Sequence, residues 1–340
     1  YENNAEYERY SHSQRLFSNG SSISFDGRIH EQITKSASRV NALEKKAEFI
    51  LNHLGYDAEV IDFDKKLKRN QPLLEKLVQE TPNSYYSHFT LAQNYSRCNG
   101  YTEALKHFHI ALSLGKMKKE MLAYIYNCIS EVYLKTSDYS KAFKYAELSK
   151  KLFPKQCSAW YLLYKISKAL DEKSNCIKHL KSLYSNMIGS ENFPAPIVDT
   201  VPNRISVLDT LIKELVAAGE NKDAVEYLKE GALTTGNIKY PQAILELLPG
   251  KENLKTLGDL LNELLLLGFD TFENQNLYGV VKIKLGLYEE ALDIYWGIYR
   301  KTPEQQDVLK RISGLYAKLG DMNKAQEIMT IYQNGVPNHA

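Results

Sequence analysis

The chain has 340 residues, of which 44% are hydrophobic and 25% are charged, as in an ordinary soluble protein. Its 43 basic and 41 acidic residues give a formal charge of +2, which provides no strong overall electrostatic signature for binding nucleic acid or an anionic membrane. Apolar runs such as Leu264–Leu267 are far shorter than the roughly 18 residues of a membrane span. We therefore expect a soluble, cytoplasmic protein without a membrane span or signal segment.

Two further features bear on the class of protein. The chain begins at Tyr1 and not at a methionine, so we expect it to be part of a longer protein. Its four cysteines are spaced 30, 29 and 19 residues apart, which matches no zinc-binding motif and predicts reduced thiols. These cysteines are Cys98, Cys128, Cys157 and Cys176.

Residues 1–60 contain short β-prone runs, as in a mixed sheet. The runs are Leu16-Phe17, Ile23–Phe25 and Phe49–Leu51, with turn signals at Asn19-Gly20 and Asp26-Gly27. Between them, the polar segment Ile33–Val40 predicts a loop or a short helix.

Four segments between residues 14 and 75 resemble a known family when they are taken in order. They read Gln-Arg-Leu-Phe at 14–17, Phe-Asp-Gly-Arg-Ile-His-Glu at 25–31, His-Leu-Gly-Tyr at 53–56 and Lys-Arg-Asn-Gln-Pro-Leu-Leu-Glu at 68–75. They are similar to the last part of a bacterial family 2 glycosyltransferase domain of the GT-A type, followed by its linker helix. Bacterial enzymes of this family often carry a tetratricopeptide tail, and the bacteriocin S-glycosyltransferases have a similar layout. The resemblance implies an α/β remnant of that domain at 1–60 and a linker helix at 61–84.

The resemblance also implies roles for four residues. Glu31 would be the general base or would orient the acceptor, since inverting transfer needs a group that removes the acceptor proton. His30 would contact the donor phosphate or the acceptor, and Arg28 would face the diphosphate. His53 resembles the histidine that completes a Mn²⁺ or Mg²⁺ site in the family. If the resemblance is set aside, His53 is interpreted as a structural residue, because it precedes a glycine turn.

One part of the family pattern is missing. The nucleotide-binding half, with its metal-binding Asp-x-Asp motif, would precede Tyr1. Asp62-Phe-Asp64 has the spacing of that motif, but it leads into a lysine-rich helix and is predicted to cap that helix. We therefore expect this chain alone to be inactive and to need no cofactor, whereas the longer protein would use a divalent metal and a nucleotide sugar.

From about residue 85 to 335 the chain has an internal repeat. A small residue opens the second helix of each predicted pair, with gaps of 38, 34, 48, 67 and 34 residues between successive ones. Two gaps equal the 34-residue tetratricopeptide period. The gap of 67 predicts a degenerate repeat between Tyr240 and Leu267, and the gap of 48 predicts a loop insertion near 185–203, which contains Pro194, Pro196 and Pro202. The small residues are Ala104, Ala142, Cys176, Ala224, Ala291 and Ala325.

This pattern resembles the tetratricopeptide family and predicts a mainly α protein, a right-handed α-solenoid of about seven helix pairs. Large residues fill the spaces between pairs: Tyr95, Trp160, Tyr295 and Tyr316. Glycines are expected to take positive φ in the turns Asn99-Gly100, Gly219–Asn221, Gly286-Leu287 and Gly320-Asp321, and Pro154 and Pro303 to follow second helices.

Tyrosine is abundant, at 24 residues. Tyr124, Tyr126, Tyr161 and Tyr164 are candidates for a peptide-binding groove, because the tyrosine ring packs while its hydroxyl binds polar groups. The alternative is that these rings pack between repeats.

Two functions follow from the sequence. The first is the scaffold and acceptor-binding part of a nucleotide-sugar-dependent glycosyltransferase with a polypeptide acceptor or a homodimeric assembly. The second is a non-catalytic module for protein–protein interaction. No hydrolase or protease signature of the Ser/His/Asp or Cys/His type is present.

Overall fold

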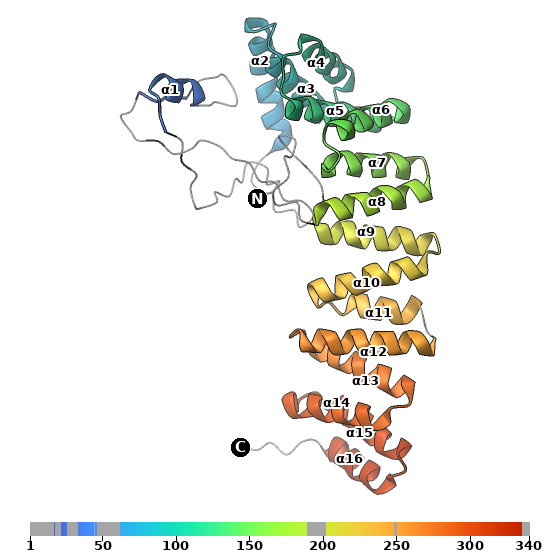
Figure 1. The fold of residues 1–340 in the computed structure, drawn as a ribbon. Coiled ribbons are helices and arrows are strands. Elements are labelled where there is room, and N and C mark those ends of the chain that lie inside the picture. Colours follow the sequence, from blue (N-terminus) through green and yellow to red (C-terminus); the bar gives the residue numbers. More distant parts are fainter. Residues whose placement is uncertain are drawn as a thin grey trace. The chain divides into compact units, whose positions relative to one another are not determined.

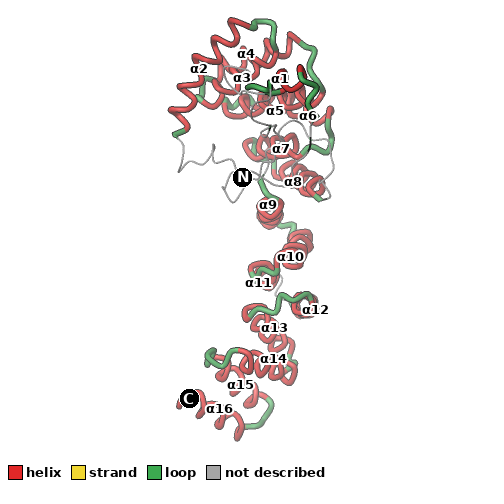
Figure 2. Tube along the Cα trace, turned by 90° about the vertical axis from the view of Figure 1, so that its left-hand side faces the viewer, coloured by secondary structure: helices red, strands yellow, loops and turns green. Residues whose placement is uncertain are grey.

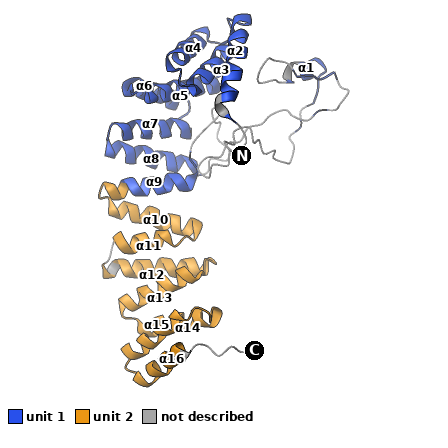
Figure 3. Ribbon diagram, turned by 180° about the vertical axis from the view of Figure 1, so that it is seen from behind, with its two compact units in different colours: residues 1–214 blue, residues 215–340 orange. Residues whose placement is uncertain are grey.

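The structure is a computed structural model that describes residues 17, 22–25, 33–43, 45, 62–188, 202–247 and 250–334. Within these ranges the chain forms sixteen helices and no strand, so the prediction of a mainly α protein is confirmed (Figure 1). The chain divides into two compact units, residues 1–214 and 215–340 (Figure 3).

Little of the predicted α/β remnant falls within the described ranges. Ile23–Phe25 is described and forms no strand with other described residues, and the short-helix alternative for Ile33–Val40 is met by α1 (Thr34–Arg39). The Ser36 hydroxyl donates to the Ser24 carbonyl at 2.6 Å and lies 3.0 Å from the Ser24 amide nitrogen. These contacts join α1 to the preceding segment.

Helix α2 (Phe63–Glu80) begins at a side-chain cap. The Asp62 carboxylate accepts a hydrogen bond from the Lys65 amide at 3.0 Å, as predicted for Asp62-Phe-Asp64. At its other end, the Tyr95 hydroxyl donates to Glu75 at 2.9 Å and so ties α2 to α3.

The rest of unit 1 consists of helix pairs joined by short turns (Figure 2). The core of the first two pairs includes Phe89, Phe108, Ile125 and Ile129, all nearly or fully buried. The pairs are α3 (Tyr85–Arg97) with α4 (Tyr101–Leu114), α5 (Lys119–Lys135) with α6 (Tyr139–Leu152), and α7 (Cys157–Ala169) with α8 (Lys173–Met187); α9 (Arg204–Ala217) follows.

Unit 2 continues the same local pattern. Its core includes Ala291 and Tyr295 of α14 and Ile312 of α15, each fully buried. The helices are α10 (Asn221–Thr235), α11 (Lys239–Leu247), α12 (Lys251–Leu266), α13 (Phe272–Leu285), α14 (Tyr288–Lys301), α15 (Asp307–Lys318) and α16 (Met322–Asn334). Pro154 and Pro303 follow α6 and α14, where they were expected.

The repeat residues are buried in the helices that the spacing assigned to them. All six are at most 6% exposed, because a small side chain lets the paired helices approach closely. The long interval between Ala224 and Ala291 contains α11 and α12. In α12, Gly258 lies 34 residues after Ala224 and 33 before Ala291, and a Cβ added there would lie 3.5 Å from Val281 of α13.

The same turn follows six of the described helices. In each turn one residue has a φ between +56° and +87°, and the next amide donates to the carbonyl five residues earlier at 2.8 to 3.0 Å. This is the Schellman arrangement. The first turn corrects a prediction, since Asn99 takes the positive φ of 60° and Gly100 has −79°. The six residues are Asn99, Ser137, Asp171, Gly219, Gly286 and Gly320.

Candidate peptide-binding pocket

The predicted site residues fall into two groups. Arg28, His30, Glu31 and His53 lie outside the described residues. Within the described ranges, no group of three or more His, Cys, Asp or Glu side chains is placed to hold a metal ion. The four candidate tyrosines are all described, on α5 and α7.

The two tyrosines of α5 pack against their neighbours. The Tyr124 ring lies 5.5 Å from the Phe89 ring, and its hydroxyl accepts a hydrogen bond from Gln93 Nε2 at 2.9 Å. The Tyr126 ring lies 5.8 Å from that of Tyr145. Both contacts match the packing alternative considered for these residues.

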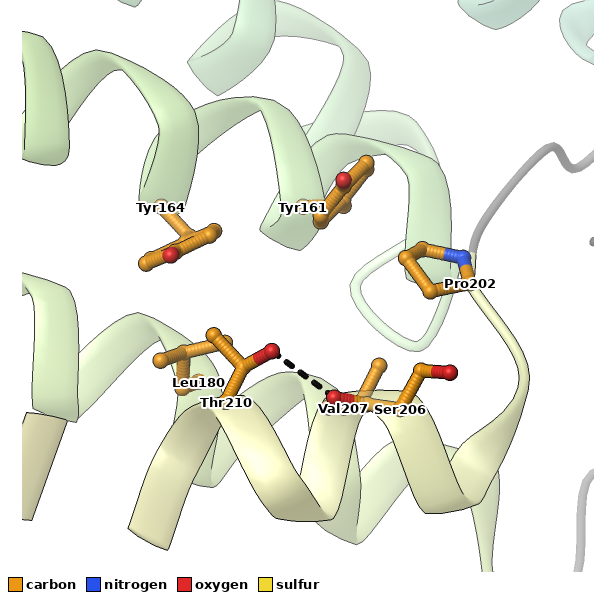
Figure 4. Close-up of a pocket in the computed structure, with 7 residues that line it drawn as sticks. All are labelled: Tyr161, Tyr164, Leu180, Pro202, Ser206, Val207 and Thr210. Atoms are coloured by element: carbon orange, nitrogen blue, oxygen red, sulfur yellow. Dashed lines mark hydrogen bonds between the residues drawn. The ribbon is translucent and has the colours of Figure 1, made fainter. Parts of the chain in front are cut away.

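The two tyrosines of α7 line a cavity of about 150 Å³ (Figure 4). Their rings lie 6.1 Å apart with an interplanar angle of 27°. In the close-up they face the first turns of α9 across the open space. The other lining residues are Leu180 of α8, Pro202, and Ser206, Val207 and Thr210 of α9.

The sequence of the third repeat helps to explain this cavity. Tyr164 stands twelve residues before Cys176, at a position where four other repeats have small residues. In the second repeat this residue, Ser130, is fully buried and donates a 2.8 Å hydrogen bond to the Ala142 carbonyl. A phenol ring is too large for the same close crossing, and Tyr164 instead lines the cavity. The small residues are Ala92, Ser130, Gly279 and Ser313.

The cavity is lined by polar and apolar groups together. Leu180 and Val207 are each 1% exposed, whereas both tyrosines are half-buried. The Thr210 hydroxyl donates to the Ser206 carbonyl at 2.7 Å, which leaves its oxygen able to accept a hydrogen bond. Such a site suits an apolar side chain carried by a polar main chain.

Charged groups adjoin the α7 side of the cavity. Lys168 Nζ lies 2.7 Å from Glu214 Oε1, and Lys165 Nζ lies 5.4 Å from the centre of the Tyr161 ring. Burial, with a further contribution from the nearby Glu214 carboxylate, raises the pKa of Tyr164 above its ordinary value. Tyr164 is therefore a neutral phenol at physiological pH.

The sequence identified one wall of the cavity but missed the other. Ser206, Val207 and Thr210 follow the predicted insertion near 185–203, and the 48-residue gap concealed their register. A search for the apolar periodicity of the helix after the prolines would have located α9, though not its distance from Tyr161.

None of the described helices is both long enough and apolar enough to cross a membrane.

No protein-family model matches the sequence, and no curated protein matches it. The fold is similar to several solved structures. A crystal structure of MamA has 14% identity and a TM-score of 0.40, covering 54% of this chain and 94% of that one. PilF of Pseudomonas aeruginosa has 16% identity and a TM-score of 0.41, covering 63% and 89%. A tetratricopeptide repeat protein from Parabacteroides merdae has 7% identity and a TM-score of 0.39, covering 75% and 94%.

Proposed function

We propose that this chain is a protein-interaction module, and that the cavity between α7 and α9 receives one apolar side chain of a partner peptide. The observation that carries this proposal is the cavity itself, with two tyrosine rings on one wall and with Leu180 and Val207 among its other lining residues. A cavity of about 150 Å³ is large enough for a benzene ring, and hence for a leucine or phenylalanine side chain. Tyrosine also loses little conformational entropy when it forms a contact surface.

The proposal is tested by selecting random 12-residue peptides displayed on phage against the whole chain. The Thr210→Trp variant places an indole in the cavity and is used in parallel. Thr330→Trp is a matched control, because Thr330 is at an exposed position of α16 and its hydroxyl also donates to the carbonyl four residues earlier. Circular dichroism establishes that both variants are folded.

We expect peptides with a large apolar residue to be enriched on the wild-type chain and on Thr330→Trp, but not on Thr210→Trp. Failure to enrich any peptide, or equal enrichment on all three proteins, would refute the proposal.

A second candidate function is sugar transfer by a longer protein that includes this chain. It rests on the order of the four segments between residues 14 and 75 that resemble a family 2 glycosyltransferase. In that protein Glu31 would accept the proton from the acceptor, His30 and Arg28 would contact the donor, and His53 would bind Mn²⁺ or Mg²⁺. The test is turnover of a panel of nucleotide sugars with Mn²⁺ by the full gene product. Turnover abolished by Glu31→Gln and by His53→Ala would support this function, and a lack of turnover and of donor binding would exclude it.

A further inference from the structure

Charge is unevenly distributed along the repeats, although the whole chain is nearly neutral. Residues 116–181 contain fourteen lysines and six acidic residues, a formal charge of +8. Residues 215–340 contain thirteen basic and seventeen acidic residues, a formal charge of −4. The helices that supply Tyr161, Tyr164 and Leu180 to the cavity thus belong to a basic segment of the chain.

Two lysines of this segment lie on the same face of α7 as the cavity tyrosines. Lys165 is four residues after Tyr161, and Lys168 is four residues after Tyr164, so each lysine lies one helical turn from a tyrosine. The Lys165 ammonium group contacts the Tyr161 ring, and it makes no ion pair with a described residue.

Lys168 is paired, but only the lysine side of the pair is accessible. Its side chain is 57% exposed, whereas that of its partner Glu214, on α9, is 12% exposed. Taking the lysine away from a largely buried carboxylate would be costly. A carboxylate from a partner would therefore approach the exposed side of Lys168 without displacing Glu214.

We infer that the partner segment is an acidic peptide, with carboxylates next to the apolar side chain that enters the cavity. This inference rests on the proposed function. The apolar residue would occupy the space between Tyr161 and Val207, and flanking aspartate or glutamate residues would pair with Lys165 and Lys168. The lysines of 116–181 would also attract an acidic segment from a distance and raise its association rate.

The test uses the peptides enriched on the wild-type chain in the phage selection. Their net charge is compared with that of the unselected library, and the affinity of the most enriched peptide is measured by fluorescence anisotropy. The measurement is made with wild type, Lys165→Glu and Lys144→Glu, at low and at high salt. Lys144 is a matched control, because it lies in the same basic segment and undergoes the same change of charge on an exposed face of α6.

We expect the enriched peptides to be net negative. Lys165→Glu should weaken binding roughly tenfold, and Lys144→Glu should change it by less than about twofold. Added salt should weaken binding to the wild type more than binding to Lys165→Glu.

The other outcomes separate this inference from the proposed function. Peptides that Thr210→Trp fails to bind, but that show no excess of acidic residues, would overturn the inference and leave the proposed function standing. Equal losses of peptide affinity in Lys165→Glu and Lys144→Glu would show that only the net charge of the protein matters. That result would also overturn the inference. A selection that enriches no peptide would refute both.

Discussion

The ring of Tyr295 lies directly against the Cα of Gly279, so that a Cβ added at Gly279 would be 2.7 Å from the ring Cζ. Tyr295 is fully buried, and its hydroxyl donates to the Asn276 carbonyl at 3.3 Å. A glycine in the middle of α13 has a cost in helix propensity, and the tyrosine accounts for its presence. Gly231 and Tyr240 have the same relationship, with a distance of 2.6 Å to the ring Cε1.

Gly279→Ala is therefore expected to destabilise the protein. Displacing a buried ring costs about 1–3 kcal/mol, which exceeds the gain of about 1 kcal/mol in helix propensity. Urea unfolding followed by circular dichroism measures the difference. Gly314→Ala is the control, because α15 leaves open space around Gly314 and only the stabilising effect of alanine should remain. Equal stability of the two variants would contradict the packing described for Tyr295.

Ser137→Gly is expected to stabilise the protein. Ser137 has a φ of 60° in the turn between α5 and α6, a conformation that glycine adopts more readily than serine. The expected gain is about 0.5–1 kcal/mol, reduced by the greater freedom of glycine in the unfolded chain. Gly320→Ser makes the reverse change at the corresponding turn, where φ is 87°, and should lower the urea midpoint. Shifts in the same direction would show that φ does not decide stability at these turns.

Acid is expected to destabilise the first repeat through His107, whose ring stacks on that of His88. His88 Nε2 lies 3.0 Å from the Pro82 carbonyl, to which it donates, and His88 Nδ1 lies 2.9 Å from His107 Nδ1. Burial lowers the pKa of His107, with further lowering by His88 and Lys106, against the opposing effects of Glu103 and Glu75.

The sign of the pH effect follows from this lowered pKa. The unfolded chain protonates His107 more readily than the folded chain does, so stability is complete above about pH 6.5 and is lost as the pH falls below it. His107→Gln keeps an N–H donor but does not titrate, and its urea midpoint should fall less between pH 7 and pH 5. A fall as large as that of the wild type would contradict the assignment. His109 and His179, whose pKa values burial also lowers, account for the residual loss.

A buried polar network joins the second and third repeats. Asn127 Nδ2 donates to Gln156 Oε1 at 3.1 Å, and Gln156 Nε2 lies 2.6 Å from the Ser149 carbonyl. Gln156→Ala leaves the buried Asn127 amide without this partner and should cost about 1–3 kcal/mol in urea unfolding. Replacing both Asn127 and Gln156 by leucine removes the unpaired groups and should cost less than the single change. If the double variant is the less stable, the cost lies in packing and not in the unpaired amide.

The sequence predicted the helix pairs well, because the helix crossing depends on one small residue at a regular spacing. Ala104 and Ala142 are both fully buried at the predicted positions. The helix cap at Asp62 was also predictable, because it depends only on a residue three positions further along the chain. The turn at Asn99 was assigned to the wrong residue, since asparagine also tolerates positive φ.

The candidate site was less predictable, because it depends on contacts between distant residues. Tyr124 and Tyr161 both lie on first helices of repeats, but only their neighbours distinguish packing from the lining of a cavity. Nothing local to Val207 or Thr210 indicates that they face Tyr161. The roles of Glu31 and His53, and peptide binding itself, remain predictions.

The most direct test of the proposed function is the affinity of the most enriched peptide for three proteins: wild type, Thr210→Trp and Thr330→Trp. Fluorescence anisotropy of the labelled peptide should show binding at least about tenfold weaker to Thr210→Trp and unchanged binding to Thr330→Trp, since only the first substitution fills the cavity. Equal affinity for all three proteins would contradict a binding role for the cavity between α7 and α9.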